Sequence, residues 1–144
     1  MKESSFARLL KEKLSPIGHW TRIENVAGVG VPDVNWYPGQ DIWMELKVTN
    51  TYKVKFQASQ ISWGKLRHKK GGGIWVVIRT EKEIIISDSR AVYDKIQYEN
   101  SKPWLHVNVA KNLGITFKKP FEWETLIDVL LMKENSDITI GDVL

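Results

Sequence analysis

Apolar residues near the start of the chain follow a helical spacing. Residues 3–14 place apolar side chains three or four positions apart, at Phe6, Leu9, Leu10 and Leu14. This spacing predicts an amphipathic helix that Ser4 or Ser5 caps and Pro16 ends. Residues 19–26 predict a strand, because their side chains can alternate between two faces.

Residues 31–48 contain two β-rich runs on either side of Tyr37-Pro38-Gly39-Gln40. Proline before glycine suits the centre of a type II turn, because proline fixes φ and glycine accepts a positive φ. The stretch therefore predicts a β-hairpin. In the second run, one face carries Ile42, Met44, Leu46 and Val48, and the other face carries Trp43, Glu45 and Lys47.

The middle of the chain predicts a surface segment, a helix and two strands. Residues 49–55 are polar and basic, whereas residues 56–70 have one helical face formed by Phe56, Gln60, Trp63 and Arg67. Gly71 is a natural C-cap for this helix. Residues 74–79 are almost continuously apolar, which is typical of a central strand, and residues 83–87 predict the next strand.

The last part of the chain predicts two more helices and a further strand. A helix capped by Ser87, Asp88 or Ser89 would extend to about Ile96. The remaining expectations are a polar linker over residues 98–103, a strand over 104–110 that pairs with 114–117, and a helix over 121–133. The resulting order, α-β-β-β-α-β-β-α, predicts an α/β (α+β) fold.

The length of 144 residues predicts one domain, which we place at residues 1–135, with residues 136–144 as a C-terminal tail or dimer arm. No apolar run approaches the ~18 residues that span a membrane. The first residues lack the apolar core of a signal peptide, so a cytoplasmic protein is expected. The absence of cysteine excludes disulfides and thiolate metal sites.

The charge is distributed unevenly along the chain. The formal net charge is +4 and the isoelectric point is about 9.2, which is compatible with nucleic-acid binding. Basic residues gather after the hairpin, at Lys53, Lys55, Lys65, Arg67, Lys69 and Lys70, whereas the last stretch is acidic. We expect these six residues to contact the phosphates of a nucleic acid, although those at the end of the helix could equally well stabilise its dipole.

The hairpin also carries the strongest candidate chemistry. A carboxylate and an amine at Glu45 and Lys47 are costly to bury in an apolar strand without a partner or a task. Asp33 on the first run could reach the same place, and two converging carboxylates form a hard-oxygen site for Mg²⁺ or Mn²⁺. Alternatively, Glu45 and Lys47 are an exposed pair and Asp33 is a turn residue.

The hairpin register decides whether this site can form. A two- or four-residue loop centred on Pro38-Gly39 would pair Asp33 with Met44, which belongs to the wrong face. Pairing Asp33 with Glu45 requires one extra residue, either as a bulge or in a three-residue loop. Because bulges are common beside active sites, we expect a distorted first strand near Asp33.

These residues resemble a known nuclease signature. Pro32-Asp33 followed by Glu45-Leu46-Lys47 is similar to the PD-(D/E)xK motif. The preceding Gly28-Val29-Gly30-Val31 and the later Gln60 resemble the VRR-NUC and Holliday-junction-resolvase-like branch, which includes small phage nucleases. The resemblance covers residues 3–88. It implies a restriction-endonuclease-like core, in which helices flank a central mixed β-sheet and the motif carboxylates lie on the central hairpin.

The resemblance also implies roles for individual residues. Asp33, Glu45 and the backbone carbonyl of Leu46 would bind the metal, Mg²⁺ with Mn²⁺ as a substitute. The catalytic residues would be Asp33, Glu45, Lys47, Gln60 and Glu3. Lys47 would position the attacking water, with Gln60 beside it. Gln60 could instead be a solvated helical side chain, and Glu3 could simply stabilise a helix N-terminus.

The resemblance points to a Mg²⁺-dependent DNA endonuclease that selects branched DNA such as a Holliday junction. Members of this branch often act as homodimers, and a phage-encoded member would act in the cytoplasm of its bacterial host. The alternatives are a nucleic-acid-binding module with a degenerate or unused site and a structural subunit. Trp43, on the same face as Glu45, could stack on a base or serve packing.

Overall fold

The computed structural model describes residues 1–23 and 29–132. Its elements in chain order are α1 (Glu3–Leu14), β1 (His19–Arg22), β2 (Val34–Tyr37), β3 (Ile42–Val48), β4 (Lys53–Lys55), α2 (Ala58–Lys69), β5 (Trp75–Arg79), β6 (Glu83–Asp88), α3 (Ser89–Tyr93), β7 (Gln97–Glu99), β8 (Lys102–His106), α4 (Val107–Leu113), β9 (Ile115–Lys118) and α5 (Trp123–Met132). In this part of the chain, no helix is long and apolar enough to cross a membrane.

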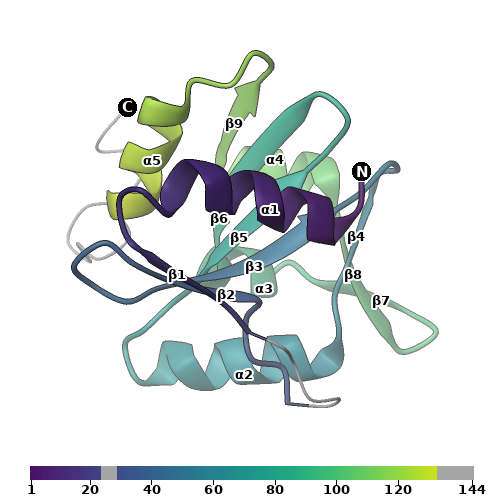
Figure 1. The fold of residues 1–144 in the computed structure, drawn as a ribbon. Helices are drawn as coiled ribbons and strands as arrows, with labels where there is room; N and C mark the ends of the chain where they lie inside the picture. Colours follow the sequence, from purple (N-terminus) through teal and green to yellow (C-terminus); the bar gives the residue numbers. More distant parts are fainter. Residues whose placement is uncertain (24–28, 133–144) are drawn as a thin grey trace.

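A six-stranded sheet in the order β1-β2-β3-β5-β6-β9 forms the centre of the molecule (Figure 1). β3 and β5 pair in parallel, and the other neighbouring strands pair antiparallel. A second sheet, in the order β4-β8-β7, lies beside it. The predicted fold class, a mixed sheet flanked by helices, is confirmed.

The two faces of the central sheet contact different helices. One core contains α1 and α5 side chains together with Met44 and Leu46 of β3 and Trp75 of β5. The other core contains α2, α3 and the small sheet, and takes Val76 and Ile78 from β5. Successive β5 residues therefore enter opposite cores, as the apolar run of a central strand predicts.

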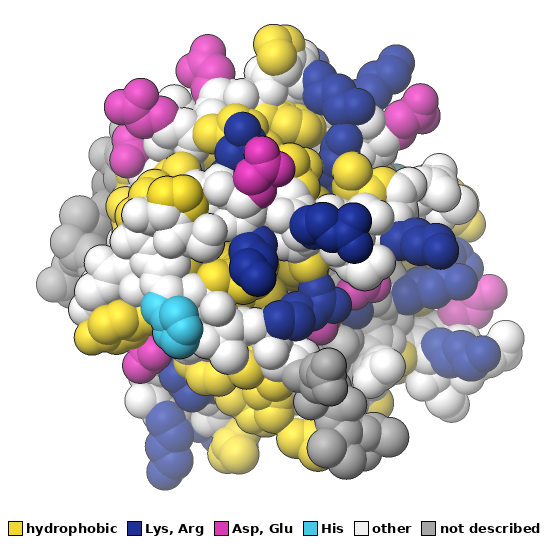
Figure 2. All heavy atoms as spheres, in the orientation of Figure 1, with side chains coloured by type: hydrophobic (Ala, Val, Ile, Leu, Met, Phe, Trp, Pro, Cys, Tyr) yellow, Lys and Arg dark blue, Asp and Glu magenta, His cyan; other side chains and the backbone are white. Residues whose placement is uncertain are grey.

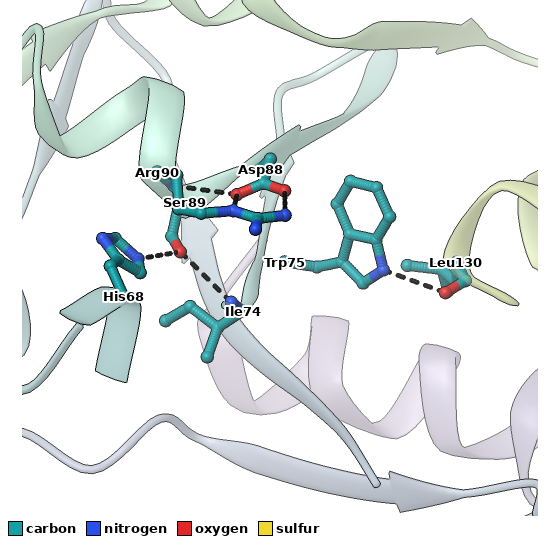
Figure 3. A network of polar contacts seen from close by, with 7 residues as sticks. All are labelled: His68, Ile74, Trp75, Asp88, Ser89, Arg90 and Leu130. Atoms are coloured by element: carbon teal, nitrogen blue, oxygen red, sulfur yellow. Dashed lines mark hydrogen bonds and ion pairs between the residues drawn. The ribbon is translucent and has the colours of Figure 1, made fainter. Parts of the chain in front are cut away.

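Two buried tryptophans fix the helices of the first core. The indole Nε1 of Trp36 donates to the carbonyl oxygen of Leu14 at 3.0 Å, at the end of α1. The indole of Trp75 donates to the carbonyl oxygen of Leu130 at 2.9 Å, in α5 (Figure 3). Each aromatic side chain thus fills the core while its N–H satisfies a helix carbonyl.

On the opposite face, a serine connects α2, α3 and β5. The Ser89 hydroxyl accepts a hydrogen bond from the amide of Ile74 at 3.1 Å and lies 2.8 Å from Nε2 of His68 (Figure 3). Further along α2, a Cβ atom on Gly64 would lie only 2.4 Å from the ring of Tyr93. Glycine therefore allows α2 to pack closely on α3. α2 lies over the face of β3 that carries Glu45 and Lys47.

Residues 97–118 differ from the prediction. The expected polar linker is the hairpin β7–β8, whose turn residues Asn100 and Ser101 have φ values of 52° and 65°. Positive φ at both central residues matches a type I′ turn. The expected strand over 104–110 ends at His106, whose Nδ1 accepts the amide of Asn108 at 3.0 Å and so caps α4.

Consequently β9 pairs with β6 rather than with residues 104–110. The strand prediction rested on the alternation of apolar and polar residues over 104–110, but the His106 side chain caps a helix that begins at Val107. The segment 49–55, expected to be irregular, contains β4, and α3 ends at Tyr93 rather than near Ile96. The tail or dimer arm at 136–144 and part of the strand over 19–26 lie outside the described residues.

Candidate active site

The hairpin register places Asp33 opposite Glu45. β2 and β3 pair regularly, with Val34 opposite Met44 and Trp36 opposite Ile42. Five residues separate the paired Trp36 and Ile42, so a longer turn, rather than the predicted bulge or three-residue loop, brings Asp33 into register with Glu45. The expected distortion within the first strand is wrong, because β2 is regular and begins just after Asp33.

Asp33 contacts β3 through its side chain. Its Oδ2 accepts a hydrogen bond from the backbone amide of Leu46 at 2.8 Å. Its own carbonyl oxygen accepts the amide of Ile23 at 2.7 Å. A carboxylate that accepts a backbone N–H is held in one orientation, so Asp33 is fixed beside the residue that follows Glu45.

Glu45 and Lys47 lie on the β3 face that α2 covers. Their exposed fractions are 1% and 8%. The Lys47 Nζ lies 3.5 Å from Oε2 of Glu45 and 4.9 Å from the ring centroid of Phe56. The alternative of an exposed strand pair is therefore wrong.

Gln60, in the first turn of α2, connects these two side chains. Its Nε2 donates to Oε2 of Glu45 at 2.8 Å, and its Oε1 accepts from Nζ of Lys47 at 3.0 Å. The same Oε1 accepts the amide of Gln57 at 2.9 Å, so the side chain is fixed at the start of the helix. Gln60 is buried, which contradicts the alternative of a solvated helical glutamine.

The glycine before the motif lets the chain approach α2. Gly30 has a φ of +76°, and a Cβ atom there would lie 2.0 Å from the carbonyl oxygen of Ser59. The backbone around Gly30 therefore packs directly on the helical turn that carries Gln60. Gly28, the other glycine of this loop, lies outside the described residues.

Glu3 lies at the edge of this group of residues. It is exposed in the first turn of α1, yet its carboxylate interacts electrostatically with Lys47 and Asp33. Desolvation is the largest influence and raises the pKa of Glu3. Within residues 1–23 and 29–132, no three His, Cys, Asp or Glu side chains are close enough together to hold a metal ion.

The buried negative charge of the site is incompletely balanced. Burial raises the pKa of Glu45, and the neighbouring carboxylate of Asp33 raises it further, while Lys47 opposes both effects. Tyr93, which sequence reasoning missed, is also affected. Burial and then the charges of Glu45 and Asp33 raise the pKa of its hydroxyl, which has no hydrogen-bond partner within the described residues.

The donor set of the site fits a hard cation. Mg²⁺ in proteins is commonly held by one or two carboxylates and keeps several water ligands for substrate phosphates to replace. Asp33 and Glu45 supply two such carboxylates, and a divalent cation would offset the charge that Lys47 balances only in part. The Leu46 carbonyl as a further ligand stays a prediction.

The six predicted DNA-binding residues form two separate groups. Lys53 and Lys55 lie on β4, whereas Lys69 and Lys70 lie at the far end of α2, about 18 Å along the helix. Arg67 has its guanidinium 5.3 Å from the Trp63 ring centroid. The guanidinium also lies 5.7 Å from the Trp43 ring centroid, so Trp43 and Trp63 both pack with Arg67. Lys65 is exposed and lies between the two groups of lysines.

Figure 2 shows how charge is distributed over one face of the molecule. Lys and Arg side chains gather on the half that carries the start of α1 and β4, and acidic side chains gather near α5.

Comparison with solved structures gives an informative similarity. No protein-family model and no curated protein matches the sequence. Among solved structures, the chain is similar to Hjc of Archaeoglobus fulgidus, a Holliday junction resolvase from an archaeal hyperthermophile. The TM-score is 0.57 over 77% of this chain and 93% of Hjc, with 14% sequence identity. The chain therefore has a nuclease-like fold of the resolvase type.

Proposed function

We propose that this protein is a Mg²⁺-dependent DNA endonuclease that hydrolyses phosphodiester bonds in branched DNA. The proposal rests on the buried arrangement of Asp33, Glu45 and Lys47 on a resolvase-type fold. Gln60 forms hydrogen bonds to both Glu45 and Lys47. The same motif supports placing the protein in the VRR-NUC and Holliday-junction-resolvase-like branch. A phage-encoded member would act in the cytoplasm of the bacterial host.

Asp33 and Glu45 would hold Mg²⁺, or Mn²⁺ in its place, together with the carbonyl of Leu46. The bound metal would stabilise charge that develops on the phosphate and would acidify a water. Lys47 is held by Gln60 at 3.0 Å, so its ammonium group is aligned to polarise that water. Glu3 would contact the metal through water from the edge of the site.

The electrostatics support a functional rather than a structural role. A buried charge without a full counter-charge is destabilising, yet here two carboxylates face one amine and the pKa of Glu45 is raised. Perturbed carboxylates that converge on one point are typical of catalytic and metal sites. A homodimer, which the resemblance implies, would place two such sites on opposed DNA strands.

The decisive experiment compares a synthetic four-way junction with a linear duplex of the same sequence. Each substrate is incubated with Mg²⁺, with Mn²⁺ or with EDTA, and Asp33→Asn serves as the control. We expect metal-dependent cutting of the junction that Asp33→Asn abolishes. If both substrates are cut equally, the proposed nuclease activity stands, but the proposed preference for branched DNA is wrong.

A nucleic-acid-binding module with an unused site is the second candidate. The observation that favours it is the lack of a third metal-binding side chain beside Asp33 and Glu45 among the described residues. This module would bind the junction without cutting it, and Asp33→Asn would leave binding unchanged with or without metal.

A further inference from the structure

We propose that the solvent face of the β4-β8-β7 sheet binds unpaired nucleotides of the substrate beside the active site. The inference rests on the proposed nuclease function and adds a substrate feature to it, namely bases that are not stacked in a duplex. This sheet lies largely outside the segment that resembles known nucleases.

The strand register gives this small sheet one buried and one exposed face. Val54 pairs with Leu105, and both side chains are buried against the body of the protein. The residues on either side of this pair must point outward. Lys53 pairs with His106, and Lys55 pairs with Trp104, so lysines and aromatic rings alternate on the exposed face.

The aromatic rings of this face form a contiguous group. Tyr52 is 52% exposed, and its ring stacks on His106 with centroids 5.2 Å apart and planes 27° apart. The Trp104 ring lies 6.0 Å from Tyr52. Exposed aromatic rings provide surfaces on which unstacked bases pack, largely independently of sequence.

The charges around these rings complement a phosphate backbone. A shallow hollow of about 100 Å³ on this face is lined by residues that include Lys53, Lys55, Lys102, Glu99 and Trp104. Three lysines face one glutamate there. Aromatic rings interleaved with lysines are typical of surfaces that bind single-stranded nucleic acid.

Glu99 occupies part of this surface in the free protein. Its carboxylate forms an ion pair with Lys53, whose Nζ lies 5.0 Å from the centroid of Trp104. Exposed ion pairs contribute little free energy and are screened by salt. A DNA phosphate can therefore replace the Glu99 carboxylate as the partner of Lys53. A base of the same strand can then stack on the Trp104 ring.

This surface is connected to the candidate active site along the chain. Lys55 ends β4 and is followed by Phe56, whose ring lies under the Lys47 ammonium group. Figure 1 shows the β7–β8 hairpin on the same side of the molecule as the start of α2, which carries Gln60. A strand held on the small sheet would therefore lead toward Glu45.

The first test measures binding of a duplex with a single-stranded arm and of a blunt duplex, by fluorescence anisotropy in EDTA. We expect Trp104→Ala to weaken binding of the armed DNA about tenfold, with less than twofold change for the blunt duplex. Trp104→Phe should retain most of the affinity, because a ring remains. Tyr98→Ala is the matched control, since Tyr98 is exposed on the same sheet but pairs with Pro103 on the other face.

The second test uses removal of the competing acid. Glu99→Gln should tighten binding of the armed DNA at least threefold more than Glu81→Gln, which makes the same charge change on an exposed residue outside this sheet. Equal effects of the two variants, or wild-type binding by both Trp104 variants, would overturn the inference. If the wild type cuts the junction but Trp104→Ala binds the armed DNA normally, the nuclease proposal stands and only this inference fails. If the variants bind as expected but the wild type does not cut, only the nuclease proposal is rejected.

Discussion

The two faces of β3 are almost equally buried but carry opposite chemistry. Ile42, Met44 and Leu46 pack against α1 and α5 in an apolar core. On the other face, Glu45 and Lys47 are held by Gln60 of α2. Apolar burial stabilises the fold, whereas a buried carboxylate costs free energy unless something balances it. Burial alone therefore does not distinguish the face that carries the candidate site, whereas its incomplete charge balance does.

The largest expected effect is on the polar face of this strand. Glu45→Gln should lower the cleavage rate about 10³-fold, because metal-assisted charge stabilisation supplies several kcal/mol to the transition state. The circular dichroism spectrum should remain that of the wild type. Asp41→Asn changes an exposed carboxylate at the hairpin turn and is the matched control. Near-normal turnover by Glu45→Gln would show that our assignment of its role is wrong.

The apolar face should show the opposite behaviour. Met44→Ala removes a fully buried side chain and should lower the free energy of unfolding by about 2–5 kcal/mol in urea denaturation. Cleavage per folded molecule should remain within a few-fold of the wild type. If Met44→Ala lost cleavage activity without a fall in the free energy of unfolding, the two faces of β3 would not differ in the way that we propose.

The pH dependence of stability sharpens the same contrast. Because the pKa of Glu45 is raised from 4.5, the folded protein binds a proton more tightly than the unfolded chain does. The free energy of unfolding of the metal-free protein should therefore fall as the pH rises above 4.5. Glu45→Gln should be more stable than the wild type at pH 8 by about 1 kcal/mol or more. Glu3→Gln should show a smaller gain, and identical pH profiles for wild type and Glu45→Gln would contradict the expectation.

The smallest effect is expected far from β3. Lys69→Ala combined with Lys70→Ala should weaken DNA binding only a few-fold, and equally for all sequences, because exposed lysines contact phosphates rather than bases. The slope of binding against salt concentration should also decrease. Loss on selected sequences alone would indicate base recognition at the end of α2.

The sequence pattern predicted most of the central hairpin and the residues that meet on it. The alternation in β3 separates its two faces, and Pro38-Gly39 marks the turn, because both signals are local. The resemblance predicted Gln60 as a site residue, and its side chain forms hydrogen bonds to Glu45 and Lys47 in the structure. The roles of these residues and the metal stay predictions.

The parts that the sequence did not predict depend on distant contacts. Tyr93 lies near Glu45 only because Gly64 lets α2 pack closely on α3. The β7–β8 hairpin was missed because charged residues flank a turn without glycine, although Asn100 tolerates positive φ. The exposed aromatic face on the small sheet follows from pairing with β4, which no local pattern specifies.

The parallel pairing of β3 with β5 has a consequence for the order in which the candidate site is assembled. Gln60 belongs to the crossover between these strands, so it reaches Glu45 only after α2 has folded back onto the sheet. Closing such a non-local connection is slower than forming a hairpin. A newly made chain would therefore carry both motif carboxylates before it could align Lys47. The proposed cleavage activity would therefore require the closed crossover, and a chain that has not yet formed it would not cut DNA.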